Sequence, residues 1–101
     1  MSDAALSPEF VVHALRRIPG WSGDTTALSR TWCCPDFISA IGFMQACVPG
    51  IVAKDHHPEW TNAFDRVSVR LRTHDAGDRV TAADIDLAHH FDAVAAQWGG
   101  L

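Results

Sequence analysis

Three histidines, His56, His57 and His74, lie within nineteen positions of one another in the chain. Imidazole is the side chain whose unperturbed pKa, about 6.5, allows it both to donate and to accept protons near neutral pH. Such a group can act as a general acid in one step of a reaction and as a general base in another. The cluster therefore indicates acid–base chemistry on a small molecule.

The residues around the histidines predict how they are arranged. Pro58 keeps His57 in an extended conformation, and successive residues of an extended segment point to opposite sides. His56 and His57 should therefore contact different parts of a ligand unless the backbone bends between them. His74 follows an alternating run, and a hairpin between this run and the segment after Pro58 would bring His74 back to complete the pocket.

Other interpretations of the histidines stay open. Three histidines in 101 residues can also form a structural network or a chance cluster. A metal site needs a further ligand of fixed geometry, and the three cysteines do not show Cys-x-x-Cys spacing. We predict no metal ligand and no cofactor. Cys33, Cys34 and Cys47 are expected to be small buried hydrophobes.

The composition is that of a small globular protein, with 48% hydrophobic and 20% charged residues. A net charge of −4 argues against a nucleic-acid-binding surface, which needs clustered Lys and Arg. The chain has neither a run of eighteen apolar residues nor a basic leader, and an odd number of cysteines suits a reducing compartment. We therefore expect one domain over residues 1–101 of a cytoplasmic protein that binds neither nucleic acid nor membrane.

Two of the three predicted helices have clear start and stop signals. The first begins at Ser7-Pro8, where Ser7 can cap and Pro8 needs no N–H partner, and Pro19-Gly20 stops it. The last opens at residues 81–84 with a capping-box pattern and ends at Gly99-Gly100. His89-His90 fall outside the apolar stripe of this last helix and are expected to be solvated. The stripe consists of Leu87, Ala88, Phe91, Val94, Ala95 and Trp98.

The middle helix is predicted to start after Asp36, which can cap it. Pro49-Gly50 should end or kink it, because proline removes a backbone donor and clashes with the preceding turn. Its apolar residues form a stripe broad enough to pack on both the sheet and a neighbour. The stripe consists of Phe37, Ile38, Ile41, Met44 and Val48.

Alternating segments predict four strands in two hairpins. Residues 27–34 alternate and pair with a short strand containing Trp21. Residues 66–73 alternate with Val67, Val69 and Leu71 inward, after a turn at residues 62–65. The order α-β-β-α-β-β-α, with tight turns between paired strands, predicts an α+β fold. We expect a four-stranded antiparallel sheet with three helices on one face and the other face partly exposed or in contact with another subunit.

The run His56-His57-Pro58-Glu59-Trp60, with Phe64, Thr73-His74-Asp75 and residues 84–88 at their spacings, resembles the pterin-4a-carbinolamine dehydratase family. The resemblance extends upstream and covers most of the chain. The upstream residues that carry it are Gly20-Trp21, Arg30, Asp36-Phe37 and Gly42-Phe43-Met44.

The resemblance implies a lyase that dehydrates 4a-hydroxytetrahydropterin to quinonoid dihydropterin and supports tetrahydrobiopterin recycling, without metal or redox cofactor. It implies that His56 and His74 are the proton-transfer pair and that His57 holds and orients the pterin, so that these three form the catalytic set. It also implies substrate contacts from Asp55, Pro58 and Trp60.

An interaction protein is the alternative function. Relatives in this family also serve as binding partners or coactivator-like assembly factors, and the broad stripe of the middle helix suits self-association or such a partner. Val52 stands four positions before His56, where the family usually carries an acidic or other polar residue. Because all three histidines are present, we favour the enzyme, and we expect a homodimer or homotetramer.

Overall fold

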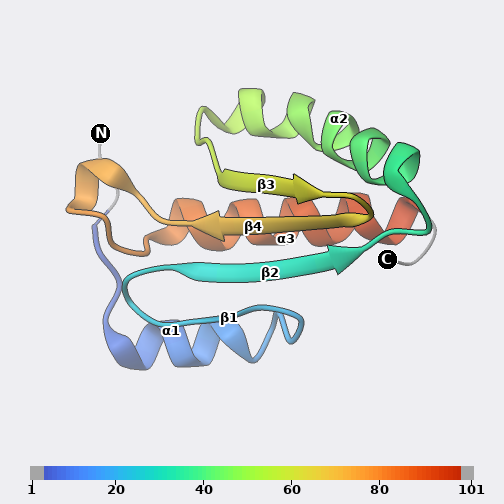
Figure 1. The fold of residues 1–101 in the computed structure, drawn as a ribbon. Helices are drawn as coiled ribbons and strands as arrows, with labels where there is room; N and C mark the ends of the chain where they lie inside the picture. The colour runs from blue at the N-terminus through green and yellow to red at the C-terminus, as the bar shows by residue number, and fades with distance from the viewer. Residues whose placement is uncertain (1–3, 99–101) are drawn as a thin grey trace.

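The computed structural model, which describes residues 4–98, has the predicted element order α-β-β-α-β-β-α. Three helices and four strands form an α+β fold (Figure 1). A short 3-10 helix, η1, joins the last strand to the last helix. The elements are α1 (Pro8–Leu15), β1 (Ser22–Gly23), β2 (Leu28–Cys33), α2 (Phe37–Lys54), β3 (Glu59–Ala63), β4 (Arg66–Leu71), η1 (His74–Ala76) and α3 (Ala82–Gln97).

The four strands form one antiparallel sheet in the order β1-β2-β4-β3. β2 and β4 pair along their whole length, from Leu28 opposite Leu71 to Cys33 opposite Arg66. β3 and β4 form a hairpin whose tip residue, Phe64, is exposed and has a φ of 55°. The strand that follows His56 and His57 therefore lies directly beside the strand that precedes His74.

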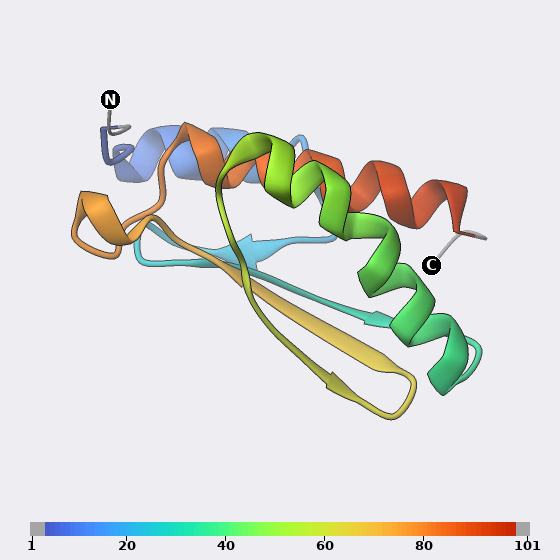
Figure 2. The ribbon, with the colours of Figure 1, turned by 90° about the horizontal axis from the view of Figure 1, so that it is seen from above.

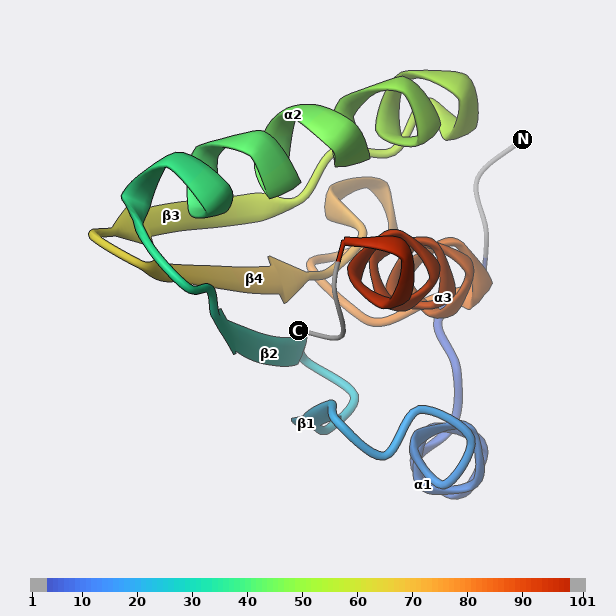
Figure 3. The ribbon, with the colours of Figure 1, turned by 90° about the vertical axis from the view of Figure 1, so that its right-hand side faces the viewer.

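All three helices cover one face of the sheet. Figure 1 looks onto the sheet with α3 behind it, and the quarter turn of Figure 2 shows the helices together on one side. In Figure 3, α2 lies towards β3, α1 lies towards β1, and α3 runs between them. The opposite face is polar, with the hydroxyls of Thr31 and Ser68 3.0 Å apart and an ion pair between Glu59 and Arg70 at 3.8 Å.

The core is built around the aromatic ring of Phe91 on α3. Its centroid lies 5.7 Å from that of Trp32, 6.3 Å from that of Trp21 and 5.7 Å from that of Trp60. Trp32 also packs against Phe43 of α2 at 5.1 Å. Close packing of large rings leaves little freedom to shift. Phe91 therefore fixes the position of α3, and with it the position of the residues at its N-terminus.

Arg30 interrupts the buried side of β2, where it is half-buried between Leu28 and Trp32. Its guanidinium lies 4.8 Å from the centroid of the Trp32 ring and donates to Asp92 of α3 at 2.8 Å. The same carboxylate oxygen accepts the indole N–H of Trp21 at 2.9 Å. A charged pair thus joins β2 to α3 at the edge of the core.

The ends of the outer helices depart slightly from their predicted positions. α1 ends at Leu15, before the predicted stop at Pro19-Gly20. The residues that follow form hydrogen-bonded turns up to Trp21 and do not continue the helix. The predicted stop at Gly99-Gly100 lies outside the described residues. Trp98, predicted to be buried, is 40% exposed, and its indole N–H donates to the carbonyl of Ser39 at 3.0 Å.

α2 does not end at Pro49 but continues to Lys54. Pro49 cannot donate to the carbonyl of Gln45, but both residues are exposed, so that water can satisfy this carbonyl. The helix ends at Asp55, which has the left-handed conformation (φ 48°) common at helix C-termini and donates its N–H to the carbonyl of Val52. The helix therefore runs directly into the histidine segment.

The buried face of α2 also differs from the predicted stripe. Phe37, Ile38 and Val48 are 55%, 81% and 43% exposed. Ile41 and Met44 are only half-buried. Because apolar residues occur on nearly every side of this helix, its sequence alone does not decide which side packs. The residues that do pack inward are Ala40, Phe43, Cys47 and Ile51.

α2 and α3 approach closely at Gly50. The imidazole of His90 lies where a Cβ on Gly50 would be, and its Nε2 donates to the carbonyl of Cys47 at 2.9 Å. His90 is therefore part of the contact between the helices, contrary to the prediction that it is solvated, whereas His89 is exposed.

Within residues 4–98, α2 is the one helix whose length and apolar composition would suit a membrane span. The core helix of a globular domain meets the same test. Four residues of α2 belong to the core described above.

Two isoleucines of α2 test which face of this helix is buried. Ile51→Ala should lower the free energy of unfolding by about 2–5 kcal/mol, because Ile51 is 3% exposed and its truncation leaves a cavity. Ile38→Ala, the comparison at 81% exposure in the single chain, should lower it by less than Ile51→Ala does. Urea unfolding followed by circular dichroism measures both. A larger loss for Ile38→Ala than for Ile51→Ala would contradict the assigned face.

Candidate active site

The carboxylate of Asp84 is the fully buried charged group of residues 4–98. Asp84 is the third residue of α3, and its Oδ2 accepts the backbone N–H of Thr81 at 2.8 Å, as the predicted capping box requires. Oδ2 also accepts the hydroxyl of Thr73 at 2.9 Å. Oδ1 lies 2.6 Å from Nε2 of His56. Three donors therefore converge on one buried negative charge.

His56 is held by this carboxylate. Its side chain is 15% exposed, whereas that of Asp84 is 0% exposed. Because the carboxylate of Asp84 accepts hydrogen bonds, Nε2 of His56 carries a proton, and Nδ1 is the ring nitrogen left for chemistry. The carboxylate also stabilises the imidazolium that forms when Nδ1 accepts a second proton. The arrangement suits a proton-transfer group with a defined tautomer.

The backbone around Asp55 directs His56 towards α3. The left-handed conformation of Asp55 turns the chain away from the axis of α2, and Pro58 restricts the residue before it. His56 then contacts Asp84, while Asp55 and His57 are exposed. The two adjacent histidines thus have different surroundings, as expected for neighbouring residues of an extended segment.

His74 begins η1, and its side chain is 92% exposed, with Nδ1 3.1 Å from Oδ1 of Asp78. Within residues 4–98, no hydrogen bond joins His56, His57 and His74 to one another. The connection between their segments is Thr73, which precedes His74 and donates to the carboxylate that holds His56. The hairpin thus brings the chain at His74 next to the His56–Asp84 pair.

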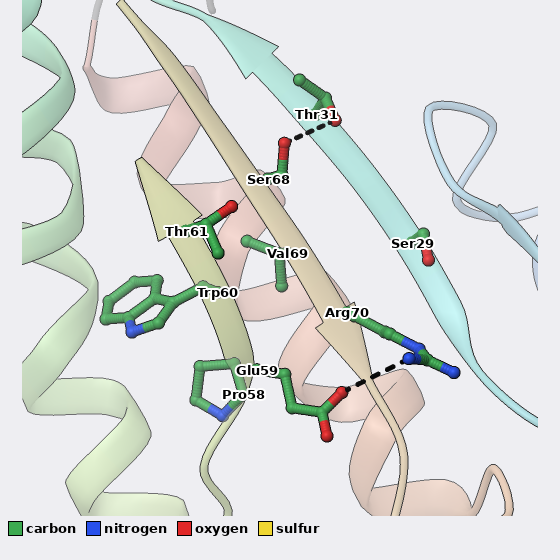
Figure 4. Close-up of a pocket in the computed structure, with 9 residues that line it drawn as sticks. All are labelled: Ser29, Thr31, Pro58, Glu59, Trp60, Thr61, Ser68, Val69 and Arg70. Atoms are coloured by element: carbon green, nitrogen blue, oxygen red, sulfur yellow. Dashed lines mark hydrogen bonds and ion pairs between the residues drawn. The ribbon is translucent and has the colours of Figure 1, made fainter. Parts of the chain in front are cut away.

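Pro58 and Trp60 lie at a hollow of about 600 Å³ on the uncovered face of the sheet (Figure 4). None of the three histidines lines this hollow, whose walls combine polar side chains with a larger apolar surface. The indole of Trp60 packs edge-on against Phe91, with ring centroids 5.7 Å apart. Trp60 is therefore placed at the margin of the core. The other lining residues are Ser29, Thr31, Glu59, Thr61, Ser68, Val69 and Arg70.

A smaller cavity, of about 220 Å³, lies directly against His56. Lys54, Ala83 and Asp86 form its other walls. It therefore offers an ammonium and a carboxylate beside the imidazole. Groups of both charges can hydrogen-bond a heterocycle that carries donors and acceptors on its edge.

No cysteine lines the hollow at Trp60 or the cavity at His56. Burial raises the pKa of the Cys47 thiol to about 12 and also raises the pKa of Cys34. Cys33 is exposed, contrary to the prediction that all three are buried. Among residues 4–98, no three His, Cys, Asp or Glu side chains are grouped to hold a metal ion.

Sequence reasoning did not include Asp84, Thr73 and Thr81 among the site residues. The capping-box pattern does predict Asp84 as the N3 residue of a helix, and capping engages only part of a carboxylate. The second carboxylate oxygen of such a residue is free to accept another hydrogen bond, and this marks the residue as a candidate partner for a site histidine. The partner of that oxygen, His56, is 28 positions away and becomes evident only in the folded chain.

The fold and this site define a small α+β domain with a carboxylate-held histidine at the N-terminus of its last helix. Residues 4–94 match the model of the family described as "Pterin 4 alpha carbinolamine dehydratase". The chain belongs to this family, and the resemblance inferred from the histidine run is confirmed.

Curated relatives and a solved structure agree with this assignment. A protein of Opitutus terrae is 41% identical over 90 residues, covering 89% of this chain and 91% of its own. One of Rhodopseudomonas palustris is 50% identical over 86 residues, covering 83% and 84%. Both are named "Putative pterin-4-alpha-carbinolamine dehydratase".

A structural neighbour is described as a "transcriptional coactivator/pterin dehydratase" from Brucella melitensis. It matches with a TM-score of 0.83 at 38% identity, covering 89% of this chain and 97% of its own. The predicted fold is confirmed by this match.

The different surroundings of two histidines predict different effects on stability. His56→Ala should lower the free energy of unfolding by about 1–3 kcal/mol at pH 7, because buried Asp84 loses a donor. His74→Ala should change it by less than about 0.5 kcal/mol, since this side chain is exposed. Urea denaturation of the two variants provides the comparison, and equal stabilities would contradict the His56–Asp84 contact.

Proposed function

We propose that this protein dehydrates a 4a-hydroxytetrahydropterin (4a-carbinolamine) to the quinonoid dihydropterin, and that it thereby supports recycling of tetrahydrobiopterin. Family membership supports the class of substrate. The observation that carries the mechanism is the 2.6 Å contact between Nε2 of His56 and buried Asp84, because it gives one histidine of the predicted set a defined tautomer.

The reaction needs an acid and a base but no net supply of protons. The C4a–O bond breaks as the hydroxyl takes a proton and leaves as water, and the ring nitrogen N5 loses its proton. Hydroxide is a poor leaving group, so that a general acid at the oxygen and a general base at N5 both lower the barrier. Exchange with solvent then returns both groups to their starting states.

We assign the base to His56 and the acid to His74. Accepting the N5 proton at Nδ1 converts His56 into an imidazolium, which the carboxylate of Asp84 stabilises. His74 is accessible to a bound substrate and protonates the departing hydroxyl. His57, exposed between them in sequence, orients the pterin. Asp55 and Pro58 flank the substrate, and Trp60 supports the strand that begins there.

Substitution with glutamine tests the histidine roles while keeping an amide that can donate to Asp84. His56→Gln and His74→Gln should each slow dehydration by roughly 10²-fold or more, the usual contribution of a positioned acid or base. His89→Gln, on the exposed side of α3, is the matched control and should keep the wild-type rate.

The measurement is stopped-flow absorbance of chemically generated 4a-hydroxytetrahydropterin near neutral pH. Its decay without protein provides the baseline. A wild-type rate equal to this baseline would refute the dehydratase function, and an unchanged rate for His56→Gln would refute the assigned role of His56.

A second function, binding another protein or a second copy of this chain, is favoured by the exposed apolar residues of α2. The Brucella melitensis neighbour is described as a coactivator as well as a dehydratase. We propose that this surface of α2 makes the contact, whereas the uncovered sheet face is more polar. The exposed residues are Phe37, Ile38, Val48 and Val52.

We further propose that the protein is a homodimer or homotetramer. Light scattering coupled to size exclusion should give a mass of two or four times the 11.0 kDa of the chain. Ile38→Glu should reduce this mass, because it places a charge on the apolar surface of α2. Thr31→Glu, on the uncovered sheet face, is the control and should not. A monomeric wild-type protein would contradict self-association, and dissociation by Thr31→Glu alone would place the contact on the sheet.

A further inference from the structure

We infer that Thr73 is a positioning residue whose hydroxyl, itself held by Thr81, orients Asp84 and thereby fixes the tautomer and basicity of His56. This inference rests on the proposed function for its effect on turnover, but not for its effect on His56. Neither Thr73 nor Thr81 forms a hydrogen bond with His56 itself. The carboxylate of Asp84 lies between the two threonines and His56.

The direction of each hydrogen bond follows from counting protons. A threonine hydroxyl has one proton to donate. Thr73 donates its proton to Oδ2 of Asp84 at 2.9 Å. In the contact between the hydroxyls of Thr73 and Thr81, at 2.7 Å, Thr81 must therefore be the donor. This chain of hydrogen bonds runs from Thr81 through Thr73 to Asp84, and the proton of each hydroxyl is donated within it.

This chain determines which oxygen of Asp84 faces His56. Oδ2 is occupied by the N–H of Thr81 and the hydroxyl of Thr73. Two donors on one oxygen restrict rotation of the carboxylate and leave Oδ1 for Nε2 of His56. Thr81 and Asp84 are both 0% exposed, so that water does not readily replace a lost donor.

The same hydroxyl connects the two histidines of the proposed proton-transfer pair. Thr73 immediately precedes His74, and its backbone N–H donates to the carbonyl of Arg79 at 2.9 Å, closing the loop that carries His74. The side chain of Thr73 thus ties this loop to the carboxylate that holds His56. Loss of the hydroxyl should loosen the placement of His74 relative to His56 as well as the orientation of Asp84.

Removal of the hydroxyl should raise the pKa of His56. A hydrogen bond from Thr73 disperses the negative charge of Asp84, so that its loss leaves more charge to stabilise the imidazolium. The other charged groups at His56 are Lys54 at the end of α2 and Asp86 on α3, which line the cavity beside it. Their opposite charges are unchanged by a substitution at position 73.

Thr73→Val keeps the shape of the side chain and removes the hydroxyl. The pKa of His56 is measured by NMR titration of its ring Cε1–H signal, which is assigned from its absence in His56→Gln. We expect the pKa to rise by roughly half a unit or more. We also expect kcat for the pterin carbinolamine to fall by about tenfold, with KM changed less.

Two further variants separate positioning from a general loss of structure. Thr73→Ser retains the hydroxyl and should restore both the pKa of His56 and kcat. Thr61→Val removes a threonine hydroxyl from the exposed sheet face and should change neither. If Thr73→Val does not fold, Thr73→Ala gives the same titration without the added methyl group.

The outcomes distinguish this inference from the proposed function. An unchanged pKa of His56 and an unchanged kcat in Thr73→Val would overturn the role of Thr73 even if the wild type is an active dehydratase. A wild type without dehydratase activity would overturn the proposed function, and the titration alone would then decide whether Thr73 controls His56.

Discussion

The buried negative charge of Asp84 is the constraint on which the arrangement of the site depends. A carboxylate removed from water is costly unless hydrogen-bond donors replace its hydration. The donors come from three separate parts of the chain, namely the end of α2 through His56, the junction of β4 and η1 through Thr73, and the N-terminus of α3 through Thr81. Satisfying one charge therefore requires these three segments to meet.

The rest of the fold makes this meeting possible. The packing of Phe91 against three tryptophans sets the position of α3 on the sheet. The β3–β4 hairpin returns the chain from His57 to Thr73. The left-handed conformation of Asp55 ends α2 immediately before His56. A site built on the ends of packed elements keeps its geometry, while His57 and His74 stay exposed to solvent and to a ligand.

α2 combines two roles that its sequence does not separate. One side contributes Phe43 and Ile51 to the core, and the other presents Ile38 and Val52 to solvent. The close contact of His90 with Gly50 and with the carbonyl of Cys47 selects the packed side. The exposed apolar surface is the reason for proposing a protein contact beside the proposed dehydratase function, because such a surface is rarely left uncovered without use.

Local patterns in the sequence were sufficient to predict the element order and the inward residues of β4. They also predicted the helix caps at Ser7 and Asp36 and the capping box at Thr81. All of these features depend on residues that are close together in the chain. The histidine run likewise indicated the family. The buried side of α2, its continuation through Pro49 and the contact of His56 with Asp84 were decided by the tertiary structure. Each of these depends on groups distant in sequence: the packing of α3 against α2, the access of water at Pro49, and a carboxylate 28 positions from the histidine it holds.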